Sequence, residues 1–295
     1  MHVTLLGGTG FVGRALAARL VKDGASVRVA ARHAADAEGL PEGVERRTAD
    51  VRDPRAGPEA VADTDAVVYL PGCVTGRTAE PFRELHVNAP RACAQAAARA
   101  GARRFVFLSA LGVRWDAPAL ADRTKAEGER AVANVFADAT SVRAGLTLGP
   151  GDHVTAPLAS AMRRFPVLPV LGARTRLTPL HIDDLVAAVA AVLDGHHTAG
   201  RTYELGGPVE TDMLGLCRAV RRAAGARCWL PPLPEPLAML AGAAAELAAG
   251  PPFCRDQVRL MRTPKVPTGE LPQADALGLT PRDPLPELAG LLGRA

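Results

Sequence analysis

The chain has 295 residues, of which 48% are hydrophobic and only 4% aromatic, so a globular core must be built mainly from alanine, valine and leucine. A net charge of +4 suits an anionic ligand, yet no dense run of basic residues with interleaved aromatic residues predicts nucleic-acid binding. The five cysteines are scattered, which argues against a disulfide framework, and the histidines lack the spacing of a metal site. No apolar run approaches the roughly 20 residues that a transmembrane helix needs.

The first half of the chain alternates short β-branched runs with alanine-rich helical stretches. It begins directly with a strand pattern, so we expect no signal peptide and a cytoplasmic location. The predicted strands are 2–6, 26–30, 44–48, 65–70, 104–109 and 139–144, and the predicted helices are 11–23, 58–63, 87–100 and 118–137. This alternation predicts an α/β fold with a doubly wound parallel sheet, a Rossmann fold with right-handed crossovers.

Past residue 150 proline becomes frequent and the alternation loosens. One clear helix remains at 181–194, with Asp183 and Asp184 in its first turn, where the helix dipole favours anions. We therefore expect a dinucleotide-binding domain over 1–150 and a smaller C-terminal lobe for substrate or partner over 151–295, with helix 181–194 packing back on the first domain. The segment 233–261 either docks on a membrane or partner protein or packs on the chain's own second lobe, and its short alanine-rich pattern favours the latter.

The stretch "VTLLGGTGFVGRALAARL" places three glycines between a strand and a helix. Gly7 permits a tight turn, Gly10 lets the backbone approach a pyrophosphate, and Gly13 lets the helix pack close to the strand. The helix N-terminus adds free N–H groups for the anion. We therefore assign a dinucleotide site to this loop and include the intervening residues Thr9, Phe11 and Val12.

The end of the second predicted strand bears on the choice of cofactor. NAD-binding chains carry an acidic residue there for the ribose 2′-hydroxyl, but this chain has Ala31 followed by Arg32. A guanidinium can bind the 2′-phosphate of NADP with two hydrogen bonds, so we expect NADP(H) to be preferred over NAD(H). The alternative is that Arg32 is a solvated charge at the end of a strand.

Several further motifs follow in order: "TADVRDP", "YLPG", a helix beginning near Asn88, a strand ending in Ser109, and "RTKAEGE" with Lys125. Together with the G-x-x-G-x-x-G spacing they resemble the extended and atypical branches of the short-chain dehydrogenase/reductase superfamily over nearly the whole chain. Among these branches the sequence is most similar to the NAD(P)H-binding accessory subunit of respiratory complex I (alpha subcomplex subunit nine) and its epimerase/dehydratase-like relatives. One departure is Ala144, where that family has proline.

This resemblance implies roles for particular residues. Asp50 would meet the adenine amino group and Val51 would line its ring. The end of the fourth strand, Leu70, Pro71 and Gly72, would lie beside the cofactor, and Asn88 would belong to the same site. Lys125 would bind the nicotinamide ribose, and Ser109 would orient a substrate oxygen.

Active members of the superfamily have a tyrosine four residues before the lysine, on the same helix face. Here that position is Ala121, so tyrosine-dependent proton transfer should be absent. We therefore expect a holder of NADP(H) with a structural, accessory or sensing role, and a respiratory or membrane-associated partner at the inner face of a membrane follows from the resemblance. The alternative is an NADP-dependent oxidoreductase or epimerase/dehydratase acting on a small or sugar-like substrate, with water or Asp122 as the acid.

Overall fold

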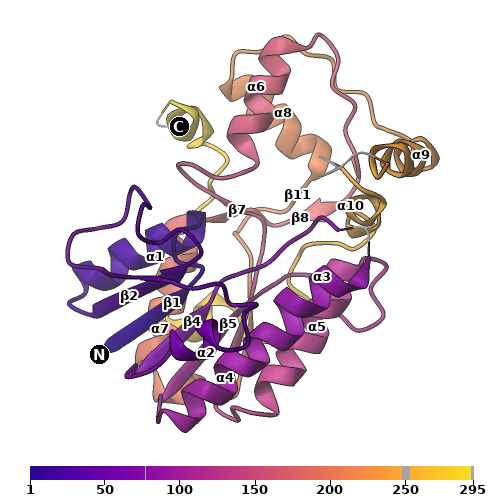
Figure 1. Cartoon of the computed structure of the whole chain (residues 1–295). Helices are drawn as coiled ribbons and strands as arrows, with labels where there is room; N and C mark the ends of the chain where they lie inside the picture. Colours follow the sequence, from indigo (N-terminus) through magenta and orange to yellow (C-terminus); the bar gives the residue numbers. More distant parts are fainter. Residues whose placement is uncertain (77, 248–252, 294–295) are drawn as a thin grey trace.

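A seven-stranded parallel sheet forms the centre of the molecule (Figure 1). The computed structural model describes residues 1–76, 78–247 and 253–293. In spatial order the strands are β10 (Thr202–Leu205), β6 (Thr140–Ala144), β5 (Arg104–Ala110), β4 (Ala66–Tyr69), β1 (His2–Leu6), β2 (Ser26–Ala31) and β3 (Glu45–Thr48). The order reverses between β1 and β4, which is where open α/β sheets bind their ligands.

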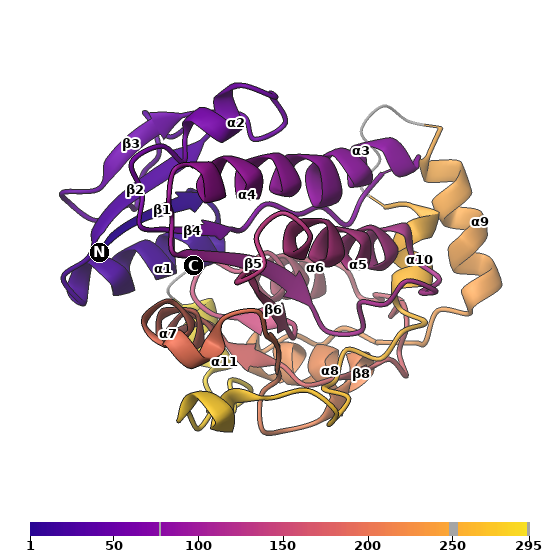
Figure 2. The ribbon, with the colours of Figure 1, turned by 90° about the horizontal axis from the view of Figure 1, so that it is seen from below.

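Helices cover both faces of this sheet (Figure 2). One face packs on α1 (Phe11–Lys22) and α7 (Ile182–Asp194), which also contact each other. The other face packs on α2 (Ala56–Glu59), α4 (Ala89–Arg99) and α5 (Leu120–Ala133). The short α3 (Ala79–Arg83) and the π-helix η1 (Glu84–Asn88) lead into α4, where the sequence predicted a single helix from residue 87.

A second hydrophobic core lies beyond the carboxyl ends of the strands (Figure 1). It is built from α6 (Thr155–Arg164), α8 (Met213–Ala223) and α11 (Leu288–Leu292). The remaining elements are β7 (Thr147–Leu148), β8 (Arg176–Leu177), β9 (Leu180–His181), η2 (His196–Thr198), β11 (Thr211–Asp212), α9 (Glu235–Ala245), α10 (Arg255–Leu260) and η3 (Ala274–Leu277). Because β10 and α7 belong to the sheet layers and not to this second core, the chain enters the second core and returns to the sheet more than once.

The segment 233–261 folds into α9 and α10, with residues 248–252 outside the described part of the chain. α9 packs against α10 through Gly242, where a Cβ would come within 3.0 Å of the Arg255 nitrogen. Its other side exposes Leu237 and Leu240. Among the residues that the structure describes, no helix combines the length and hydropathy needed to cross a membrane.

Candidate functional site

A groove of about 980 Å³ runs along the carboxyl ends of β1 to β4, and we call it the dinucleotide groove. Many of the residues assigned from sequence line it: Gly7, Thr9, Gly10, Phe11, Val12, Gly13, Arg32, Val51, Leu70, Pro71 and Gly72. Four others, Asp50, Asn88, Ser109 and Lys125, are described but are not among its lining residues. The groove therefore gathers the glycine loop and the ends of four strands at the switch point of the sheet.

The glycine loop has the local geometry that a pyrophosphate needs. Gly7 has a φ of +75°, and its N–H donates a 2.8 Å hydrogen bond to the Ala30 carbonyl, which fixes the turn on β2. Gly13 packs so closely on Gly8 that a Cβ there would overlap the Gly8 backbone. At Gly10, by contrast, a Cβ would meet only the Gly7 carbonyl oxygen, at 3.5 Å. The space beside Gly10 is thus open toward the groove, at a helix N-terminus that no described side chain caps.

Three basic residues line one end of the dinucleotide groove, namely Arg32, His33 and Arg52. Asp50 lies beside them, but its carboxylate is held by Arg52 at 2.6 Å. The hydrogen bond from Arg52 is the main cause that lowers the pKa of Asp50 to about 2. Asp50, which the resemblance assigns to the adenine amino group, is therefore already engaged by a cation.

Lys125 lies beside the groove. Its Nζ donates a 3.1 Å hydrogen bond to the carbonyl oxygen of Leu108 and lies 3.4 Å from where a Cβ on Gly72 would be. Leu108 and Gly72 both line the groove, so the ammonium lies close to two of its lining residues. Burial lowers the pKa of Lys125, while the carboxylate of Glu129 opposes that shift.

Ser109 lies on the same side of the sheet as Lys125. Side chains alternate along a strand, so Ser109 shares a face of β5 with Phe107, whose ring lies 5.9 Å from the Lys125 ammonium. Ser109 is 4% exposed, and its Oγ has no hydrogen-bond partner among the described residues. The two residues therefore lie on the same face of the sheet, and neither is among the residues that line the groove.

The start of α5, where active relatives have their tyrosine, is sealed by the C-terminal part of the chain. Ala121 is 3% exposed. The backbone N–H groups of Leu120 and Ala121 donate to the two carboxylate oxygens of Asp256 at 2.8 and 3.2 Å. Asp256 lies in α10 and is itself 2% exposed. Because Ala121 is buried, a phenol at this position would have to displace neighbouring groups.

Asp122, considered above as a substitute acid, forms an ion pair. Its Oδ2 lies 2.6 Å from Nζ of Lys265, and both side chains are nearly buried. Burial raises the pKa of Asp122, and the charge of Lys265 opposes that shift. The carboxylate therefore ties α5 to the C-terminal segment, and the expectation that it can act as a free acid is not supported by its surroundings.

His86 is a polar group at the site that the sequence analysis did not identify. It is fully buried in the π-helix, where its Nε2 accepts a 3.0 Å hydrogen bond from the Cys73 N–H. Its Nδ1 lies 2.8 Å from the Thr124 hydroxyl, which donates to the Leu120 carbonyl. Burial lowers the pKa of His86 to about 3, so the ring is neutral. This chain of hydrogen bonds fixes the groove loop at Cys73 to α5.

Asn88 takes no part in these contacts. Its side chain is exposed and donates a 2.8 Å hydrogen bond to Glu84, one turn earlier. The resemblance placed it at the cofactor; in the structure Asn88 does not line the groove itself, but its partner Glu84 does.

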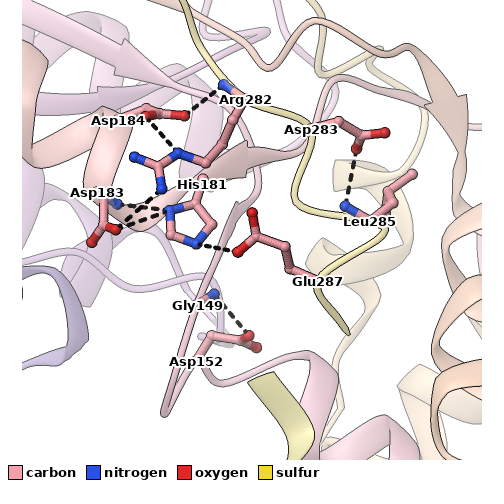
Figure 3. A network of polar contacts seen from close by, with 9 residues as sticks. All are labelled: Gly149, Asp152, His181, Asp183, Asp184, Arg282, Asp283, Leu285 and Glu287. Atoms are coloured by element: carbon pink, nitrogen blue, oxygen red, sulfur yellow. Dashed lines mark hydrogen bonds and ion pairs between the residues drawn. The ribbon is translucent and has the colours of Figure 1, made fainter. Parts of the chain in front are cut away.

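A second cavity of about 450 Å³ lies at the N-terminus of α7. Figure 3 shows the polar contacts of this region. His181 caps that helix by accepting a 3.1 Å hydrogen bond from the Asp183 N–H, and its Nε2 lies 3.6 Å from Glu287. Arg282 binds Asp184 through its backbone N–H at 2.8 Å and through Nε at 3.2 Å. These contacts fasten the C-terminal residues to α7.

A family model described as NAD(P)H-binding matches residues 7–148. The ceramide reductase of Caulobacter vibrioides is 34% identical over 254 residues, which are 82% of this chain and 76% of that protein. The chain belongs to the NAD(P)H-binding, short-chain dehydrogenase/reductase-like family. As a member of this family it binds a nicotinamide dinucleotide.

The predicted resemblance to the complex I subunit is confirmed as well. The mitochondrial NADH dehydrogenase [ubiquinone] 1 alpha subcomplex subunit 9 of Arabidopsis thaliana is 31% identical over 214 residues, or 70% of this chain. The matched region spans only 53% of that relative's own length.

Solved structures confirm the predicted doubly wound fold. The UDP-glucose 4-epimerase of Thermotoga maritima superposes with a TM-score of 0.76 over 100% of this chain and 98% of that one, at 16% identity. At that identity the likeness establishes a shared fold and nothing more.

Proposed function

We propose that this family member holds NADP(H) in the dinucleotide groove and serves a structural, accessory or sensing role without tyrosine-dependent catalysis. The observation that carries the proposal is the sealed start of α5, where buried Ala121 takes the place of the phenol and Asp256 binds its backbone. General acid or base help of that kind is typically worth about 10²–10⁴-fold in rate.

The groove fits a dinucleotide at three points. The pyrophosphate would lie over Gly10, where the space that a Cβ would fill is open. The N–H groups in the first turn of α1 have no acceptor within the helix and point toward this space. The adenosine ribose would lie at Arg32, whose guanidinium supports a preference for NADP over NAD. The nicotinamide ribose would lie toward Gly72, above the ammonium of Lys125. A bound reduced cofactor supplies a hydride, and the chain's own residues supply binding and orientation.

Two measurements test this proposal. Titration of NADPH and NADH at fixed salt should show tighter binding of NADPH, and Arg32→Ala should weaken NADPH selectively. Equal affinities in the wild type would contradict the preference. The cofactor-saturated wild type should also show little or no reduction of simple ketones or sugar-nucleotide analogues, and robust turnover would overturn the non-catalytic role.

A second candidate is an NADP-dependent reductase. The 34% identity to a ceramide reductase over most of both chains favours it, as does the retention of Ser109 and Lys125 together. The direct assay is consumption of NADPH in the presence of a ceramide whose 3-hydroxyl has been oxidised to a ketone, because a carbonyl carbon can accept the hydride, with Lys125→Ala as the control. Lys125-dependent consumption would support the reductase, and its absence would favour the accessory role.

The partner and the location are proposals of the same kind. The similarity to subunits of mitochondrial NADH dehydrogenase supports a respiratory, membrane-associated protein partner. A place at the inner face of a membrane, in contact with the cytoplasm, follows from that partner. We further propose that residues 1–150 carry the cofactor and that 151–295 supply the surface for the partner or substrate.

A further inference from the structure

The end of the dinucleotide groove is formed by two neighbouring strands that finish side by side. β2 and β3 pair in parallel, with Ala31 opposite Thr48, and the Ala49 N–H donates a 3.0 Å hydrogen bond to the Ala31 carbonyl. Arg32 follows β2 and Arg52 follows β3 by a few residues. Both therefore emerge at the same edge of the sheet, and both line the groove.

Arg52 is held at this edge by Asp50. Its Nε donates to both carboxylate oxygens at 3.0 and 3.2 Å, its Nη2 donates to Oδ2 at 2.6 Å, and its backbone N–H donates to Oδ1 at 3.0 Å. The Arg52 side chain is still 50% exposed. A guanidinium has five N–H donors, so this pairing leaves Arg52 able to bind a further acceptor.

The hydrogen-bond donors at this end suit a dianion better than a neutral hydroxyl. Arg32 and Arg52 contribute two positive charges, and Asp50 and Glu84, whose charge acts on Arg52, contribute two negative ones, so the free N–H donors of the two guanidinium groups and not an excess of positive charge would hold the ligand. Arg32 is also close enough for its charge to lower the pKa of Asp50. The Asp50 carboxylate, with both oxygens occupied, is poorly placed to accept the amino group of an adenine.

We infer that Arg52 is a second cation of a ribose 2′-phosphate subsite, and that the carboxylate of Asp50 partly neutralises the charge of Arg52. This inference rests on the proposed NADP(H) site. A phosphate monoester on the 2′-oxygen takes hydrogen bonds from Arg32 and Arg52 together, and Asp50 acts as the counter-ion that holds Arg52 in position when a dinucleotide lacks that phosphate.

The test uses two ligands that differ only in the 2′-phosphate, namely adenosine 2′,5′-bisphosphate and 5′-AMP. Their affinities for the full chain are measured by calorimetry at two salt concentrations. Arg52→Ala should weaken the bisphosphate about tenfold, as expected for a hydrogen bond to a charged group, and 5′-AMP much less. The loss should shrink at high salt because the side chain is partly exposed. Asp50→Asn removes the competing charge and should tighten the bisphosphate selectively.

Arg55→Ala is the matched control, since Arg55 is an exposed arginine three residues further on that does not line the groove. If the wild type binds both ligands equally, the proposed preference for NADP fails and this inference fails with it. If the wild type prefers the bisphosphate and Arg32→Ala removes the preference, but Arg52→Ala behaves like Arg55→Ala, only the inference is overturned. A loss of both ligands to the same extent in Asp50→Asn would also overturn it, because Asp50 would then be the adenine acceptor.

Discussion

The backbone N–H of Ala121 donates a hydrogen bond of 3.2 Å to the carboxylate of Asp256, which lies 135 residues further along the chain. The same carboxylate accepts from Leu120, so one buried side chain satisfies two N–H groups at the start of α5. It is a helix cap supplied by a distant element, and it ties the helix of Lys125 to α10.

We predict that Asp256→Ala lowers the free energy of unfolding by about 1–2 kcal/mol, because two backbone donors at a helix start lose their acceptor. Asp256→Asn should cost less, since its amide oxygen can still accept one of the two bonds. Thermal and denaturant unfolding measure both variants. Asp116→Ala, which changes an exposed aspartate, should leave stability nearly unchanged. Equal melting temperatures for Asp256→Ala and the wild type would rule out the cap.

Ala121→Tyr places a phenol one turn before Lys125, as in active relatives. Because Ala121 is 3% exposed, the larger side chain must displace its neighbours, and we expect a loss of about 1–3 kcal/mol in stability. Dinucleotide affinity should stay nearly unchanged, and recovery of ketone reduction should be partial at best. The comparison is Arg130→Tyr, an exposed position on the same helix. A fully stable Ala121→Tyr enzyme whose turnover requires Lys125 would show that the site is preformed.

Burial lowers the pKa of His86 from 6.5 to about 3, which links its titration to stability. A histidine with a lowered folded-state pKa stabilises the fold above the unfolded value of 6.5, and this contribution is lost as the pH falls toward 3 because the unfolded chain binds the proton. Between pH 6.5 and 4 the wild type should therefore lose stability more steeply than His86→Gln, by up to about 1.4 kcal/mol per pH unit. Denaturant unfolding at a series of pH values measures the two slopes. Parallel profiles would mean that His86 is not buried as a neutral ring.

Most of the sheet could be predicted because buried parallel strands are continuous apolar runs, which can be recognised from the local sequence alone. The six predicted strands match β1 to β6 to within one residue at either end. The prediction was poorer where local patterns were weak. The helix expected at 58–63 is only the short α2 around Pro58, and α6 and α8 in the proline-rich second half were not expected.

In the candidate site, too, the local features could be predicted and the long-range contacts could not. The glycine loop is contiguous in sequence, so its position and the roles of Gly7, Gly10 and Gly13 could be assigned before the fold was known. Contacts between distant parts of the chain could not. Asp256 and Lys265 reach α5 from more than 130 residues away, and nothing in the local pattern around either residue marks it as a partner of that helix.

Binding in the dinucleotide groove is tested most directly by titrating NADPH into the wild type and into Gly10→Val. Gly10 has an ordinary φ of −75° and open space around its Cβ position, so the variant should fold with nearly the wild-type melting temperature. Its side chain would fill the space that the pyrophosphate needs, and we predict saturable binding by the wild type and none by Gly10→Val. Gly290→Val, at a glycine with open surroundings outside the groove, should bind like the wild type. Undiminished NADPH binding by a folded Gly10→Val variant would contradict the assignment of this groove.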